Sequence, residues 1–286
     1  MNIPITVVMP TYNAGNQFRE CAEILAKQTA NIVEVFVIDS SSTDETANIA
    51  RDFGFNVEVI PKNEFGHGKT RQYALEKAQT EIVVFMTQDA LLKEEDSVQR
   101  LVDFLIKDDE LAAVYGRQLP YPHTGPLGRF ARLYNYPDYS FINGFEDRKQ
   151  KGIKTAFLSD SFAAYKKSLL LKIGGFPKHV NFGEDTYAAA KLLMAGYKTG
   201  YCAEAAVYHA HDYSLKQEYL RCKQIGEFHK EEAWLLDTFG KAEGEGLKFV
   251  VQEMQYLIKC KNYAYIITSF FHNLVKYIAY KIGAFG

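Results

Sequence analysis

The sequence predicts an α/β protein with a doubly wound, mainly parallel sheet and a helical C-terminal extension. Three observations predict this class. Short continuous apolar runs, typical of strands buried on both faces, alternate with segments of helical periodicity over roughly the first 90 residues. Polar clusters follow the apolar runs. From Ser214 onward the pattern is mainly helical.

The first part of the chain alternates strictly between strand and helix patterns. Strands are expected at 5–10, 33–39, 57–60 and 81–86, and helices at 18–28, 44–54 and 69–79. Because each parallel strand pair needs a right-handed crossover, the helices should cover both faces of the sheet. A Rossmann-like half of the molecule follows from this alternation.

The pattern changes after residue 110. A further strand is expected at 112–116, followed by a region rich in Pro, Tyr and Gly at 117–152. A strand and a helix ending in glycine are expected within 162–176, a helix at 184–197 and a strand-like run at 200–211. We expect one domain at 1–215, with halves at 1–90 and 91–215, and a helical region at 216–286.

Composition excludes several classes of function. The chain has 286 residues and a formal net charge of −2, so no basic field indicates nucleic-acid binding. None of the four cysteines lies in a Cys-x-x-Cys pair, which argues against a zinc knuckle and favours reduced cytosolic thiols. We expect no signal peptide, because the N-terminus lacks a basic region, and no apolar run long enough to span a membrane.

The segment 246–286 has a distinct composition. Its five lysines face a single acidic residue, Glu253, and alternate with Tyr, Phe and Ile residues. Basic, aromatic, amphipathic helices are typical of contact with anionic membrane surfaces. A helical hairpin packed on the domain, or on a second subunit, is the alternative.

Polar residues follow each of the four first strands, at the edge where open α/β sheets bind ligands. Asp39 ends a buried strand, where a carboxylate can accept hydrogen bonds from a nucleotide base or ribose. Ser42 and Glu45 have the spacing of a capping box, which explains those two residues without a ligand. The four groups at this edge are 10–13, 39–44, 66–71 and 87–90.

The glycine turn before the third helix has two interpretations. Gly68, Lys69 and Thr70 match the end of a P-loop, but the first glycine of that motif should stand at position 63, which is Asn63. The alternative is a different phosphate site, in which backbone N–H groups at a helix start bind an anion and Lys69 and Arg71 add charge.

Asp89 follows a hydrophobic strand, at a place typical of carboxylates that bind Mg²⁺ or Mn²⁺ on substrate phosphates. One carboxylate holds such an ion poorly without further ligands. His209 and His211 have the i, i+2 spacing that places two side chains on one face of a strand, and they are candidate ligands that suit Mn²⁺. The alternative is an exposed histidine pair without a role.

Taken together and in this order, the motifs VVMPTYN, VIDSSSTDET, the glycine turn with its arginine, and VFMTQDA resemble family 2 glycosyltransferases of GT-A fold. The resemblance covers roughly residues 4–215. The motifs FGHGKTR, TQDA, YGRQLPYP, FLSDSFAAY, GEDTYAAAKLLMAGY and YHAHDYS are similar to bacterial rhamnosyltransferases of this family. One departure matters, because the family's usual Asp-x-Asp triplet reads Thr87-Gln88-Asp89 here and only its second carboxylate remains.

The resemblance implies an inverting enzyme that uses dTDP-L-rhamnose and a divalent ion, Mn²⁺ or Mg²⁺, in cell-surface polysaccharide synthesis. Asp185 would be the general base with Glu184 orienting it, although acids there also suit the helix dipole. His209 matches the family's metal-binding histidine and would join Asp89, with His211 the other candidate. The donor residues implied are Pro10, Thr11, Tyr12, Asn13, Asp39, Gly68, Lys69, Arg71 and Gln88.

The acceptor is expected beside the irregular region. A glycan or lipid-linked glycan would meet Arg117, Gln118, Tyr136 and Asp160, with Tyr134 a further candidate. With a lipid-linked acceptor, the basic tail would hold the enzyme on the cytoplasmic face of the membrane. If the tail packs on a second subunit instead, the enzyme is a homo-oligomer. Three alternatives remain: a UDP-sugar donor, a P-loop kinase or NTPase, and a non-catalytic sugar- or lipid-binding module.

Overall fold

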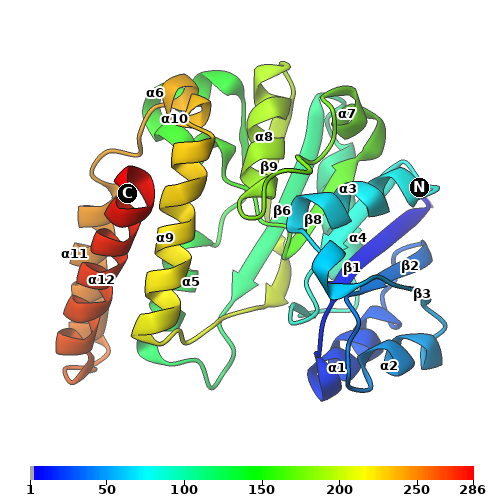
Figure 1. Ribbon diagram of the computed structural model, residues 1–286, viewed down its shortest axis with the longest axis horizontal. Helices are drawn as coiled ribbons and strands as arrows, with labels where there is room; N and C mark the ends of the chain where they lie inside the picture. The colour runs from blue at the N-terminus through cyan, green and yellow to red at the C-terminus, as the bar shows by residue number, and fades with distance from the viewer. Residues whose placement is uncertain (1–2) are drawn as a thin grey trace. The chain divides into compact units, whose positions relative to one another are not determined.

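The computed structural model describes residues 3–286 and divides them into two compact units (Figure 1). Unit 1 consists of the segment up to Arg117 together with Asp138–Phe145 and Ala156–His209. Unit 2 consists of Gln118–Pro137, Glu146–Thr155 and Ala210–Gly286. The division expected at residue 215 stays a prediction.

Unit 1 is built on a mixed β-sheet with the strand order β3-β2-β1-β4-β8-β6-β9-β5, in which β7 also pairs with β9. The strands β1 to β4 are parallel where they pair, as the sequence predicts. Their bounds are Ile5–Thr11, Ile32–Asp39, Asn56–Val59 and Ile82–Met86, and those of β5 to β9 are Leu91–Leu92, Leu111–Leu119, Phe141–Asn143, Phe162–Lys166 and Lys198–Tyr208.

The second half of the sheet differs from the expected parallel arrangement. Strand β8 runs antiparallel to β4 and to β6, and β9 runs antiparallel to β5 and β7. Apolar runs in the sequence show that a strand is buried but carry no information about its direction. The expected strand at 200–211 also ends earlier, at Tyr208.

The helices of unit 1 confirm the periodicity of the sequence, except that the helix at 97–106 was not expected. They are α1 (Gly15–Leu25), α2 (Thr46–Asp52), α3 (His67–Lys77), α4 (Ser97–Ile106), α7 (Lys167–Lys172) and α8 (Glu184–Met194). The central strands lie under them, and Val7, Val84 and Ala164 are fully buried in the core. Thr11 at the end of β1 pairs with Asp39 at the end of β2, so the polar ends of the two strands lie side by side.

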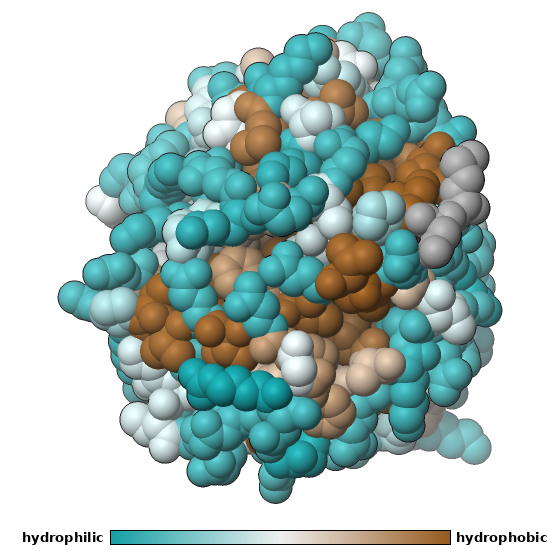
Figure 2. Space-filling model, turned by 90° about the vertical axis from the view of Figure 1, so that its right-hand side faces the viewer, coloured by the Kyte–Doolittle hydropathy of each residue, from teal (hydrophilic) through white to brown (hydrophobic). Residues whose placement is uncertain are grey.

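The edge strand β3 leaves part of the sheet accessible. Val33 and Val59 are 58% and 49% exposed. Figure 2 shows a brown, apolar region among teal surface on the side where β2 and β3 lie in Figure 1.

Unit 2 is helical. Its helices are α5 (Pro126–Asn135), α6 (Arg148–Lys151), α9 (Leu215–Glu231), α10 (Trp234–Phe239), α11 (Glu245–Lys259) and α12 (Tyr265–Phe285). Ser214 caps α9 through a capping box with Gln217. No helix among residues 3–286 combines the length and the apolar character needed to cross a bilayer.

The helices α9 and α12 lie side by side along their length (Figure 1). Glycines permit this packing, because a Cβ on Gly226 would lie 2.3 Å from the carbonyl oxygen of Tyr280 and a Cβ on Gly283 only 2.1 Å from that of Lys223. Both clashes involve backbone atoms, so the helices would have to separate to admit a methyl group.

Gly283→Ala is therefore expected to lower the free energy of unfolding by about 1–3 kcal/mol, through overpacking between α9 and α12. Chemical denaturation followed by circular dichroism measures the change. Gly246→Ala is the matched control, since that helical glycine has open space around it and should become neutral or slightly more stable. Equal effects of the two changes would contradict the packing argument.

Candidate active site

The loops after β1 and β2 are bound to each other by side chains. Asp39 accepts hydrogen bonds from the Thr11 hydroxyl at 3.0 Å and from the Ser42 backbone N–H at 2.8 Å. The backbone N–H of Asn13 donates to the Ser42 hydroxyl, and Asn13 adopts a φ of 46°. The carboxylate of Asp39 is only 1% exposed. The expectation that Asp39 faces a ligand is therefore corrected: in this structure it orders the two loops.

Tyr12 and Lys62 form the exposed part of the same region. The Lys62 ammonium donates to the Tyr12 hydroxyl at 2.7 Å and lies 4.4 Å from the centre of its ring. Tyr12 and Asn13 are exposed, and Pro10 is partly exposed. Of the strand-one residues expected to meet a donor, these three are accessible, whereas Thr11 is buried against Asp39. The capping box expected between Ser42 and Glu45 does not form, because the Ser42 hydroxyl donates to Asp39.

Gln88 braces the end of β4 against the loop after β1. Its side-chain oxygen accepts from the Tyr12 backbone N–H at 2.7 Å, and its side-chain nitrogen donates to the Tyr12 carbonyl at 3.1 Å. An amide can do both, whereas a carboxylate can only accept. This pair of bonds gives a physical reason for an amide side chain at position 88.

Asp89, His209 and His211 bring metal-binding atoms together. The pairing of Leu91 with Tyr208 in strands β5 and β9 places Asp89 next to His209, and their Oδ2 and Nε2 atoms lie 3.4 Å apart. His211 follows two residues later, and ligand atoms of all three lie within 4.8 Å of one another. One carboxylate and two imidazoles are a donor set that fits Mn²⁺.

This arrangement arises differently from the way the sequence suggested. Strand β9 ends at Tyr208, so His209 and His211 lie beyond the strand, and the strand-face argument for them is wrong. Their proximity to Asp89 depends on the pairing of β9 with the two-residue strand β5, which no sequence pattern indicated.

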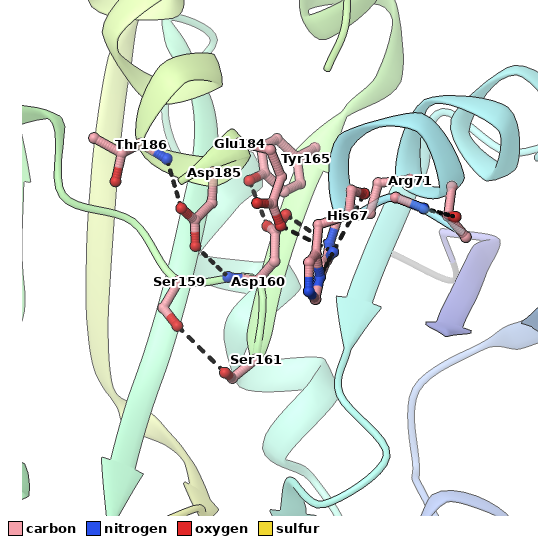
Figure 3. A network of polar contacts seen from close by, with 11 residues as sticks. His67, Arg71, Ser159, Asp160, Ser161, Tyr165, Glu184, Asp185 and Thr186 are labelled. Atoms are coloured by element: carbon pink, nitrogen blue, oxygen red, sulfur yellow. Dashed lines mark hydrogen bonds and ion pairs between the residues drawn. The ribbon is translucent and has the colours of Figure 1, made fainter. Parts of the chain in front are cut away.

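A buried cluster of charges links α3, the start of β8 and α8 (Figure 3). The guanidinium of Arg71 lies 3.0 Å from Asp160 through Nε and 2.9 Å from Glu184 through Nη1. All three side chains are at least nine-tenths buried. Arg71 was expected to contact a diphosphate, but its charge is matched here by two carboxylates, which makes it a positioning residue.

Asp185 stands at the open side of this cluster. It is half-buried, and its carboxylate accepts from the backbone N–H of Thr186 at 2.7 Å and, more weakly, from that of Asp160 at 3.4 Å. Burial and the neighbouring Glu184 raise the pKa of Asp185 to about 6. A carboxylate of this kind is ionised at neutral pH yet more basic than an ordinary aspartate, which suits a general base.

Asp160 is not placed for contact with an acceptor. It is 1% exposed, and its Oδ1 accepts from the hydroxyl of Tyr165 at 2.6 Å. Burial raises the pKa of Asp160 to about 8, although Arg71 opposes the shift. The expectation that Asp160 binds a sugar is corrected, because the carboxyl group is enclosed by protein. Tyr165 belongs to this cluster and carried no signal in the sequence beyond its place in a strand.

The glycine turn opens α3. Gly68 lies in the first turn of the helix, and a Cβ there would approach the carbonyl oxygen of Pro177 to 2.0 Å. The glycine is thus explained by close packing of backbone on backbone. Lys69, next in the chain, is exposed and remains available to an anion.

The remaining acceptor candidates differ in accessibility. Gln118 and Tyr136 are 2% and 3% exposed. Both contact Arg132, whose guanidinium donates a 2.6 Å hydrogen bond to Gln118 and lies over the ring of Tyr136. They support Arg132 rather than face a ligand. Tyr134 donates to Glu245. Arg117 is partly exposed, and its Nε atom has no hydrogen-bond partner among the described residues.

Comparison with known proteins identifies the class to which this fold and site belong. The chain belongs to glycosyl transferase family 2, whose model matches residues 6–174. It is a glycosyltransferase of GT-A fold, as the motifs of the sequence predict. The P-loop and the non-catalytic alternatives are therefore set aside.

Two curated relatives are similar over nearly the whole chain. The O-antigen chain rhamnosyltransferase WbaN of Salmonella anatum is 42% identical over 97% of this chain and 88% of its own length. The O-antigen chain rhamnosyltransferase RfbN of Salmonella typhimurium is 40% identical over 98% of this chain and 89% of its own. Among solved structures, the mannosyltransferase PcManGT from Pyrobaculum calidifontis, in complex with GDP-Man and Mn²⁺, has a TM-score of 0.68 at 20% identity, covering 98% of this chain and 86% of that one.

Gln88→Glu tests the brace. A glutamate can still accept from the Tyr12 N–H, but its second oxygen cannot donate to the Tyr12 carbonyl and would repel it. The lost hydrogen bond costs about 1–3 kcal/mol. We expect the KM for the nucleotide sugar to rise roughly tenfold or more. Gln79→Glu, at an exposed glutamine, is the matched control and should change nothing. Unchanged kinetics in Gln88→Glu would show that the brace is dispensable.

The pH dependence of the rate tests the cluster around Asp185. Since the base acts in its ionised form and its pKa is about 6, kcat/KM is expected to rise with pH through about 6. Glu184→Gln removes the like charge nearest to Asp185 and should lower the pKa of Asp185. The rising limb of the kcat/KM profile should therefore move to lower pH by about one unit.

The control for that profile is the affinity for Mn²⁺ at each pH. A histidine ligand loses metal as it protonates, and this effect should be the same in the wild type and in Glu184→Gln. If kcat/KM rises with pH in parallel with the Mn²⁺ affinity in both proteins, the rise cannot be assigned to Asp185.

Proposed function

We propose that this glycosyltransferase transfers L-rhamnose, with inversion, from dTDP-L-rhamnose to a glycan or lipid-linked glycan acceptor in the synthesis of a cell-surface polysaccharide. The observation that carries the chemistry is the coexistence, in one fold, of an Asp-His-His cluster and a half-buried carboxylate of raised pKa. The choice of sugar is supported by the two rhamnosyltransferases that are similar over nearly the full chain.

The donor side of the proposal uses the polar strand ends. Asp89 and His209, with His211, would hold Mn²⁺ or Mg²⁺, and such an ion supplies charge neutralisation for a departing diphosphate. Lys69 is exposed and cationic, so it can add to that stabilisation. Tyr12 and Asn13, which the Asp39 and Gln88 hydrogen bonds hold in place, are the accessible residues beside the nucleoside.

Asp185 performs the proton transfer. As the acceptor oxygen attacks the anomeric carbon, its O–H bond breaks and Asp185 takes the proton, while the bond from that carbon to the diphosphate oxygen breaks on the opposite face. The two backbone N–H groups that contact the carboxylate fix its orientation. One displacement inverts the configuration and needs no protein nucleophile.

Arg71 and Glu184 determine how strong this base is. Arg71 forms ion pairs with Glu184 and Asp160, and these ion pairs favour the ionised form of both carboxylates. The positive charge of Arg71 opposes the rise that burial causes in the pKa of Asp160 and of Asp185. Arg71 is thus a positioning residue in the proposal and touches no substrate.

The acceptor side rests on Arg117, the accessible cation near the end of β6. The proposal includes a location on the cytoplasmic face of the plasma membrane, with contact through 246–286, because a lipid-linked acceptor is met there. A UDP-sugar is the alternative donor, since the sequence gives no sharp choice between thymine and uracil.

Calorimetric titration with dTDP, UDP and ATP, each with and without Mn²⁺, tests the donor. We expect dTDP to bind most tightly and only with Mn²⁺, and Asp89→Ala and His209→Ala to weaken this binding about tenfold or more. Asp103→Ala, at an exposed carboxylate of α4, is the control.

Each other result has a definite meaning. A preference for UDP would retain the glycosyltransferase and reject dTDP-rhamnose. Binding of dTDP that is indifferent to Mn²⁺ and to Asp89→Ala would reject the metal site.

A further inference from the structure

Helix α12 presents an apolar stripe to the outside of unit 2. Its members are all at least 42% exposed, and they recur every three or four residues, so they lie on one face of the helix. We name this set the outer stripe: Ile267, Phe270, Phe271, Leu274, Tyr277, Ile278, Ile282 and Phe285.

The opposite face of α12 is the one that packs. Ser269, Ala279 and Gly283 are buried there, and Gly283 meets the backbone of α9 directly. The helix is therefore fixed by small residues on its inner side, while its large apolar residues face outward. The outer stripe is not needed to hold the helix on unit 2, so folding of the chain leaves its exposure unexplained.

The neighbouring helix α11 also exposes apolar residues. Leu247, Val251 and Ile258 recur at helical spacing on α11 and are 72%, 46% and 53% exposed. Monomeric proteins rarely leave an apolar surface of this extent uncovered.

The charge around the stripe favours one kind of partner. Residues 246–286 hold five lysines and one glutamate, a net charge of +4, whereas the whole chain carries −2. Glu253 is 2% exposed and accepts hydrogen bonds from Ser269 and Asn273. Two of the lysines pair with glutamates outside the segment, Lys248 with Glu245 at 3.6 Å and Lys276 with Glu218 at 3.4 Å. Among the described residues, the lysines left without an ion pair are Lys259, Lys261 and Lys281, and these supply the uncompensated charge. Lys281 lies over the rings of Tyr277 and Phe285, at 5.5 Å and 5.1 Å from their centres.

We infer that the outer stripe of α12, with the exposed apolar residues of α11, inserts into the interfacial layer of an anionic lipid bilayer. Aromatic rings with a lysine beside them suit the boundary between acyl chains and head groups, and lysines there gain from anionic lipid. A second copy of the chain is less favoured, because a symmetric contact through the stripe would bring the Lys281 side chains and other lysines of the two copies close together. The inference deepens the proposed lipid-linked acceptor but does not depend on which sugar is transferred.

Co-sedimentation of the full chain with vesicles tests the inference. We expect binding to vesicles of equal parts phosphatidylglycerol and phosphatidylcholine, and weak or no binding to phosphatidylcholine alone. Molar salt should release much of the protein, because it screens the lysines. This measurement needs no variant. Equal binding to both vesicles, or no binding to the anionic ones, overturns the inference.

Two pairs of variants locate the surface. Phe271→Glu with Ile278→Glu should lower the partition coefficient at least tenfold, since it removes insertion and adds repulsion. Val33→Glu with Val59→Glu makes the same change at equally exposed residues of unit 1 and should leave binding unaltered. Lys259→Gln with Lys281→Gln should lower binding to anionic vesicles about fivefold per lysine, and Lys27→Gln with Lys172→Gln should not.

The same samples separate this inference from the proposed function. Circular dichroism and dTDP affinity of the Phe271→Glu, Ile278→Glu protein should match the wild type, so a failure to bind vesicles does not reflect a lost fold or a lost donor site. Light scattering measures whether the protein forms a dimer in solution. A dimer that this variant dissociates, without vesicle binding by the wild type, would assign the stripe to self-association and overturn the lipid inference.

Discussion

The buried ion cluster around Arg71 is the constraint on which the geometry of unit 1 depends. One guanidinium, at least nine-tenths buried, serves two enclosed carboxylates from different elements, Asp160 before β8 and Glu184 at the start of α8. Removing either partner would leave a charge without compensation in a low-dielectric interior, which costs several kcal/mol. The cluster therefore fixes three elements relative to one another and accounts for the place of Asp185.

The close contact of α3 with the segment before α8 makes this cluster geometrically feasible. Gln72 accepts a hydrogen bond from the Phe176 backbone N–H at 2.7 Å, and Gly68 lies against the carbonyl of Pro177. Gly175 has a φ of 74°, and a Cβ there would fall 2.0 Å from the side chain of Gln72. Helix α3 and this segment thus approach at a distance that only glycines allow, and Arg71 extends from the same helix to the acids.

The sequence predicts the elements of this molecule better than the roles of its polar residues. Apolar runs and helical periodicity located the strands and helices, because apolar residue types indicate which positions are buried. Asp39, Arg71 and Asp160 were predicted to contact a substrate, yet each is turned toward protein, since position along the chain does not reveal which partner a side chain finds. The closeness of Asp89 to His209 required the β5–β9 pairing, which two residues of strand cannot signal in a sequence. Gln88 was expected to meet the donor, and its two bonds to the Tyr12 backbone became visible only in the structure.

The C-terminal helices illustrate the same limit from the opposite direction. An amphipathic pattern ordinarily identifies the face of a helix that packs against the protein, on the assumption that the apolar side is the inner one. In α12 the assumption fails, because Gly283 and Ala279 are buried while Phe270 and Phe285 are exposed. Two surfaces of one helix are apolar, and the smaller side chains form the inner one because they let the backbones approach. The larger side chains then remain for a second environment, and the lysines around them determine that this environment should be negatively charged.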